Sequence, residues 1–140
     1  MVKNLVTTTW KQNTQFTSNN PSGSELTMFD ISEEKDVDGF APKALMLSSL
    51  AGCSGLDVVS TLKKIRAEVA EFYIDVTGEL TDEHPKYYHK VKVDYHFKDA
   101  NLQADKIQKA VDLSVEKYCG VMEMFRRFAE VTTEIHLHNS

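Results

Sequence analysis

The sequence predicts an α+β fold in which a mainly antiparallel sheet is wrapped around one long central helix. The first observation is the stretch Ala41–Arg66, whose apolar residues recur at three- and four-residue steps on most sides, so that other structure must enclose it. The second is the alternation of apolar and polar residues on both sides of that stretch, which is typical of strands covered on one face. The third is the order of elements, with strand groups separated by two helical regions.

The N-terminal part contains strand-like segments separated by turn formers, followed by an acidic loop that ends in glycine and should be solvated. These segments are a hairpin at 3–18, a turn at 18–24, a third strand at 25–32 and the loop at 33–39. In the central helix, Pro42 suits the first turn because its missing N–H would have had no partner there. Lys63 and Lys64 suit the last turn, at the negative end of the helix dipole.

After the central helix, two strands are expected at 68–80 and 89–98, joined by a turn at 81–85. A second helical region should be capped by Asn101 and should break or kink near Gly120. A last strand is expected at 131–138. The residues expected to face inward are Phe72, Ile74 and Val76; Val91, Val93, Tyr95 and Phe97; Ile107, Val111, Ser114, Tyr118, Met122 and Phe125; and Val131, Thr133, Ile135 and Leu137.

The size and charge of the chain restrict the possible functions. We expect one domain, residues 1–140, and a net charge of −5 leaves no basic stripe for nucleic acid or an anionic membrane. The N-terminus lacks the apolar segment of a signal peptide, and no apolar run is expected to span a bilayer, so a cytoplasmic location is predicted. Two cysteines in a reducing compartment are expected to be thiols.

Cys53 lies at the centre of the long helix, in a belt of small residues where another backbone could approach. A lone buried cysteine is usually a small apolar residue, and Cys119 is open to the same interpretation. Cys119, however, falls at the expected helix junction, where exposed N–H groups can stabilise a thiolate. Their sequence separation, 119 − 53 = 66 residues, does not show whether they meet. Asp57, one turn after Cys53, either raises a thiol pKa or makes a hydrogen bond within the helix.

The histidines offer a metal-binding alternative. His136 and His138 would share one face of the last strand and could bind a cation together, although terminal histidines on an exposed face are more often simple surface residues. His89 and His96 differ by seven positions, which predicts opposite faces of a strand and excludes a shared site.

Two segments identify a family resemblance: APKALMLSSLAGCSGLDVVSTLKK around Cys53 and AVDLSVEKYCGV around Cys119. They resemble the two cysteine segments of the OsmC/Ohr family of thiol-dependent peroxidases, and the order of elements is similar to that family over most of the chain. The resemblance implies an intertwined homodimer with sites at its interface, Cys53 as peroxidatic and Cys119 as resolving thiol, and organic hydroperoxides as substrates. It implies a dithiol reductant, lipoyl-type thiols being one candidate, a role in oxidative-stress defence, and no cofactor.

The family's well-studied peroxidases also use an arginine from the N-terminal strands and a glutamate early in the central helix. This chain has arginine only at positions 66, 126 and 127, and neither residue after Pro42 is glutamate. Lys11 or Lys43 could supply the cation, although without the planar fork of arginine. The alternative hypothesis is a dimer without catalytic activity that senses oxidation through these thiols or binds an apolar ligand.

Overall fold

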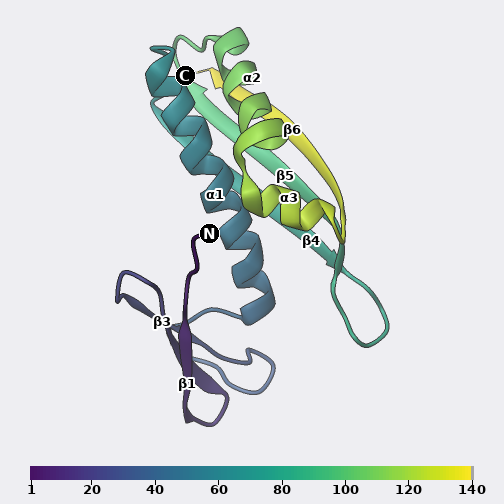
Figure 1. Ribbon diagram of the computed structural model, residues 1–140. Coiled ribbons are helices and arrows are strands. Elements are labelled where there is room, and N and C mark those ends of the chain that lie inside the picture. Colours follow the sequence, from purple (N-terminus) through teal and green to yellow (C-terminus); the bar gives the residue numbers. More distant parts are fainter. Residues whose placement is uncertain (140) are drawn as a thin grey trace. The chain divides into compact units, whose positions relative to one another are not determined.

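The computed structural model describes residues 1–139, which fall into two compact units, Met1–Met46 and a second unit that begins at Leu47 (Figure 1). Within the described residues, three α-helices, one π-helix and two three-stranded sheets confirm the predicted α+β class. Three strand pairings are antiparallel and one is parallel, so the prediction of a mainly antiparallel arrangement also holds for the described residues. The strands form two separate sheets within the chain.

The N-terminal unit is an antiparallel meander with the order β1-β2-β3. Its strands are β1 (Thr7–Gln12), β2 (Gln15–Asn19) and β3 (Glu25–Met28). The acidic loop that follows is tied back to this sheet, because Glu34 accepts hydrogen bonds from the Thr14 N–H (2.8 Å) and the Gln15 side-chain amide (3.0 Å). Of residues 1–46, all of which are described, Phe29 is the one buried apolar residue. This unit therefore has almost no core of its own.

The long helix α1 (Pro42–Lys64) lies within the predicted range. It ends at Lys64, and two residues later Arg66 takes a left-handed conformation (φ 57°) while the N–H of Ala67 bonds to the carbonyl of Leu62 at 2.9 Å. Contrary to the sequence prediction, α1 is long and apolar enough to cross a membrane by length and composition. The core helix of a soluble protein can have the same properties, so this observation is weak evidence for a membrane span.

The second unit contains a sheet with the order β4-β5-β6, and the helices lie over one of its faces (Figure 1). Its strands are β4 (Glu71–Leu80), β5 (Tyr88–Asp99) and β6 (Glu130–Asn139). Strands β4 and β5 are antiparallel, whereas β5 and β6 are parallel. A parallel neighbour requires a crossover connection, which the second helical region supplies. It consists of α2 (Ala104–Leu113), the π-helix η1 (Ser114–Tyr118) and α3 (Gly120–Arg126).

Most of the predicted inward residues form the core of the second unit, and the exceptions lie at edges. The four apolar residues expected on the inner face of β5 are all buried, and the three on β4 pack against them. On β6, Val131 and Ile135 contact the core, but Thr133 and Leu137 are exposed because this edge strand has a neighbour on one side only. Asn101 does not cap α2, because its N–H donates to Asp99 and the N-cap position is Gln103.

Candidate functional site

Cys53 lies in the middle of α1, partly buried, with its side chain against the core of the second unit. Within the described residues, no other backbone segment packs closely on the glycines beside it. A Cβ atom at Gly52 would meet nothing within 4 Å, and one at Gly55 would meet only the Ile74 side chain, at 3.3 Å. Within the described residues, Gly52 therefore leaves open space next to the thiol.

Cys119 is brought into the core by the π-helix that precedes it. A regular helical period predicted Tyr118 on the inner face, but Tyr118 is 54% exposed and Cys119 only 4%. In η1 the N–H of Cys119 bonds to the carbonyl of Ser114, five residues back, at 2.9 Å. This wider turn shifts the following residues by one position, which places the cysteine inward in place of the tyrosine.

The second helical region is interrupted at Cys119, one residue before the interruption predicted at Gly120. Cys119 has an extended conformation (φ −76°, ψ 103°) and forms the N-cap of α3. Its sulfur accepts a hydrogen bond from the backbone N–H of Met122 at 3.3 Å. The thiol therefore replaces the hydroxyl or carboxylate that usually caps a helix.

The two thiols meet in the second unit. The Cys119 thiol and the Cys53 thiol lie in the same apolar cluster and interact with each other, although 66 residues separate them in sequence (119 − 53). The pKa of Cys119 is raised to about 11, mainly by burial and also by the neighbouring Cys53 and Asp57, while the hydrogen bond from the N–H of Met122 has the opposite effect. Cys119 therefore keeps its proton at neutral pH, and the more accessible sulfur of the pair belongs to Cys53.

A buried network of hydrogen bonds lies next to the thiol pair. The Ser54 hydroxyl, next to Cys53, is hydrogen-bonded to the Tyr95 hydroxyl (2.6 Å) and to the Ser114 hydroxyl (2.8 Å). The Ser114 hydroxyl also donates a hydrogen bond to the Asp57 carboxylate at 3.1 Å. The network thus joins α1, β5 and the start of η1, and every buried side-chain polar atom of the described residues has a partner. Burial raises the pKa of the Tyr95 phenol, which stays protonated.

The sequence reasoning missed an arginine close to this network. Arg126, on α3, donates to the carbonyl of Val115 in η1 and pairs with Glu123 at 3.6 Å. Its charge also lowers the pKa of Tyr95, although less than burial raises it, so the guanidinium acts electrostatically on the buried phenol. The prediction looked for an arginine in the N-terminal strands, and no signal in the sequence alone marked one in the second helical region.

The other predicted site residues fall in different places. Asp57 raises the pKa of the Cys119 thiol, which is one of the two roles considered for it, but the hydrogen bond that it accepts comes from Ser114 in η1 and not from within its own helix. Lys11 (on β1) and Lys43 (in the first turn of α1) belong to the N-terminal unit and are exposed. Their proposed role in activating Cys53 stays a prediction.

The histidines are placed in two groups. His136 contacts Asp94 at 2.8 Å, whereas His138 is hydrogen-bonded to His96 at 3.0 Å, so the predicted pair has different partners. His89 pairs with Glu79 at 3.0 Å and lies apart from this group.

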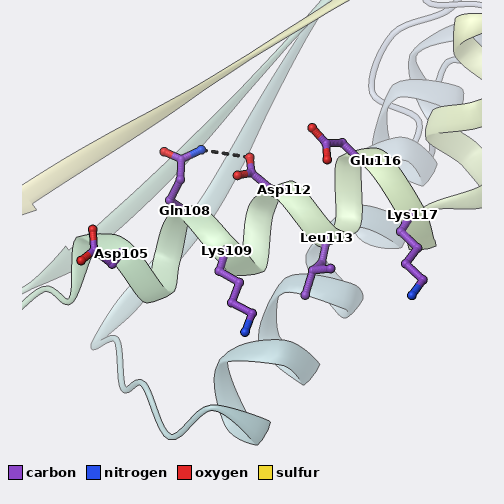
Figure 2. Close-up of a pocket in the computed structure, with 7 residues that line it drawn as sticks. All are labelled: Asp105, Gln108, Lys109, Asp112, Leu113, Glu116 and Lys117. Carbon is purple, nitrogen blue, oxygen red and sulfur yellow. Dashed lines mark hydrogen bonds between the residues drawn. The ribbon is translucent and has the colours of Figure 1, made fainter.

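A separate surface hollow runs along α2 and η1, with a volume of about 420 Å³ (Figure 2). Charged side chains such as Asp105, Lys109 and Glu116 line it, and a hydrogen bond joins the amide of Gln108 to Asp112. Neither cysteine contributes to its lining. This hollow is therefore not the thiol site.

Comparison with known proteins identifies the family. A sequence profile described as "OsmC-like protein" matches residues 33–134, a range that contains both cysteines and the buried network. The chain belongs to the OsmC-like family. Protein YhfA of Escherichia coli K12 is 30% identical over 123 residues, which cover 88% of this chain and 90% of YhfA.

Solved structures share the fold. A hypothetical protein from Aquifex aeolicus superposes with a TM-score of 0.81 at 29% identity, covering 98% of both chains. The OsmC-like protein of Mycoplasma pneumoniae gives 0.80 at 16% identity, again covering 98% of both chains. The organic hydroperoxide resistance protein OhrB of Bacillus subtilis gives 0.67 at 18% identity, covering 96% of this chain and 98% of OhrB. At identities below 25% such matches show the fold alone.

Proposed function

We propose that this protein reduces organic hydroperoxides with the thiol pair Cys53 and Cys119. The observation that carries the proposal is that the two thiols lie in one cluster and interact, one of them more accessible and the other buried with a raised pKa. A cysteine pair in contact is what a two-step thiol peroxidase requires. Structural neighbours named as organic hydroperoxide resistance proteins support this substrate class.

The proposed reaction has two steps. The Cys53 thiolate attacks the terminal oxygen of the hydroperoxide, the O–O bond breaks, the alcohol leaves after taking up a proton, and Cys53 becomes a sulfenic acid. The Cys119 sulfur then attacks the Cys53 sulfur, a disulfide forms, and water leaves with the Cys119 proton. A dithiol returns two electrons and two protons, becomes a disulfide itself, and regenerates both thiols.

The surrounding residues have positioning roles in this proposal. In the reduced state Cys119 is the protonated partner, so its S–H can donate to the Cys53 sulfur and stabilise negative charge there. The network through Ser54 and Ser114 fixes the segments that carry the two cysteines. Arg126 offers a cation in the same unit as the thiols, which Lys11 and Lys43 were expected to supply from the N-terminal unit.

A homodimer forms part of the proposal. The N-terminal unit has a three-stranded sheet but a single buried apolar side chain, which is too little for independent stability. On α1, Leu56 is 72% and Val59 48% exposed. A second copy that covers both surfaces would account for this unburied apolar area. Sedimentation should show a dimer at micromolar concentration, and a folded monomer in dilute solution would argue against it.

The test of the activity is hydroperoxide consumption with excess dithiothreitol or dihydrolipoamide, with cumene hydroperoxide compared with hydrogen peroxide. We expect faster turnover of the organic substrate and none in Cys53→Ser, whose hydroxyl is not nucleophilic at neutral pH without a base. Cys119→Ser serves as the matched control, because it should still consume about one equivalent of hydroperoxide in the first step. Equal turnover by wild type and Cys53→Ser would remove Cys53 from the reaction.

The second candidate is a redox sensor that uses the same thiols in the cytoplasm. The raised pKa of Cys119 favours it, because a thiol that resists deprotonation attacks slowly. Such a sensor would react once per chain without sustained turnover in the dithiol assay. The same experiment therefore distinguishes the two functions.

A further inference from the structure

The outward face of the β4-β5-β6 sheet carries three carboxylates at one level. Asp75 on β4 is paired with Asp94 on β5, and Asp94 is paired with Glu134 on β6. Like charges directly opposite each other destabilise a sheet unless a cation lies between them. The central carboxylate, Asp94, has only 16% of its side chain exposed, so water screens it poorly. This level of the sheet therefore requires positive charge.

A nitrogen ligand lies beside two of these carboxylates. Nε2 of His136 is 2.8 Å from Asp94 Oδ1 and 3.7 Å from Glu134 Oε2. One ligand atom from each of the three side chains lies within 4.8 Å of the others. Bonds of about 2.0–2.2 Å to one metal ion require ligand atoms roughly 3–4 Å apart, so small side-chain rotations suffice to bring all three to a common ion.

The position between the two carboxylates is held by an ammonium group. Lys92 Nζ lies 2.8 Å from Glu134 and 3.3 Å from Asp94. The Lys92 side chain is 49% exposed and flexible, so its head can swing into water when another cation arrives.

The ring of His136 is held in place by its neighbours. It stacks on His96 with ring centroids 4.4 Å apart, and His96 stacks in turn on Tyr73 at 4.5 Å. His96 is fixed by contacts to Asp75 at 3.5 Å and to His138 at 3.0 Å. These contacts orient the imidazole as outer-shell partners do at metal sites, so binding would cost little ordering of the ring.

We propose that Asp94, Glu134 and His136 form a site for a divalent first-row transition cation, with Lys92 as a displaceable competitor. One imidazole and two carboxylates suit Zn²⁺, Mn²⁺ or Fe²⁺, whereas Mg²⁺ and Ca²⁺ prefer oxygen ligands alone. Replacing the ammonium with a divalent ion balances the charge of the two carboxylates. The site uses none of the residues of the thiol chemistry and is independent of the proposed peroxidase function.

The test is a calorimetric titration of the untagged full chain with Zn²⁺ in a Cys53→Ser/Cys119→Ser background, because thiolates also bind zinc. We expect one zinc ion per chain. His136→Gln should weaken binding by at least about tenfold, since loss of even an outer-shell partner commonly costs that much. Lys92→Gln should tighten binding by about fivefold, because a unit positive charge about 4 Å away is removed.

His89→Gln is the matched control, because this histidine pairs with Glu79 on the same sheet outside the cluster. The affinity of this variant for zinc should equal that of the parent protein. Asp94→Asn provides a second ligand variant, and circular dichroism checks the fold of each. An affinity for zinc that is unchanged in both His136→Gln and Asp94→Asn would overturn the proposal. A Lys92→Gln variant that binds zinc no more tightly than the parent would also overturn it. Loss in His138→Gln alone would also overturn it, by assigning the metal to His96 and His138.

Discussion

Removing one hydroxyl group tests the buried network behind the thiols. In Ser54→Ala the lost oxygen is one that bonds to Tyr95 at 2.6 Å and to Ser114 at 2.8 Å, at a site with no exposed surface. Ser114 keeps Asp57 and the Ser54 backbone carbonyl as partners. Tyr95 loses its one described side-chain partner and becomes a buried hydroxyl without a hydrogen bond.

The expected cost follows from that orphaned group. An unsatisfied buried hydroxyl costs about 1–3 kcal/mol, so Ser54→Ala should lower the free energy of unfolding by that amount. Tyr95→Phe should cost about 1 kcal/mol, because Ser54 still bonds to Ser114. The double variant leaves no orphaned phenol. It should therefore be at least about 1 kcal/mol more stable than the sum of the single changes predicts.

Urea unfolding followed by far-ultraviolet circular dichroism, at one protein concentration, measures all four proteins. Ser60→Ala is the matched control, since Ser60 lies on the same helix but is exposed, and it should change stability by less than about 0.5 kcal/mol. Additive single effects, or a Ser54→Ala variant as stable as the Ser60→Ala control, would refute the role given to this network.

Two further changes test the packing and the thiol environment. A Cβ atom in Gly78→Ala would lie 2.6 Å from the Tyr88 ring and 3.1 Å from Leu47, so we expect the free energy of unfolding to fall by about 1–3 kcal/mol. A Cβ atom in Gly120→Ala would enter open space, so this control should keep the parent's free energy of unfolding in the same urea assay. The Cys119 pKa, raised from 9.0 to about 11, contributes stability that is complete below pH 9 and is lost as pH rises through 11. The stability advantage of wild type over Cys119→Ser should therefore shrink by up to about 2–3 kcal/mol from pH 9 to pH 11, and a gap that is constant with pH would contradict this.

Much of the second unit could be predicted because its pattern is local. The alternation through Val91, Val93 and Tyr95 has the two-residue period of a strand, and in the helix after Ala41 the apolar residues recur at three- and four-residue steps. Such patterns depend only on which side of an element faces the core. They determined the elements and their inner faces to within a few residues.

Other features could not be predicted because they depend on contacts between distant segments. The π-turn before Cys119 breaks the 3.6-residue period, so a regular helix wrongly placed Tyr118 inward. The network between Ser54 and Ser114 joins residues 60 positions apart, and no local pattern records it. The same holds for Arg126, whose electrostatic effect on the phenol of Tyr95 depends on the packing of α3.

The central claim is that Cys53 and Cys119 act as a redox pair, and disulfide mapping tests it most directly. Reduced protein is treated with one equivalent of cumene hydroperoxide, and unreduced peptides are analysed by mass spectrometry. The account predicts a Cys53–Cys119 disulfide within one chain, and in Cys119→Ser a Cys53 that over-oxidises to the sulfinic state. Wild-type protein that accumulates sulfinic Cys53 while Cys119 stays a free thiol would contradict it.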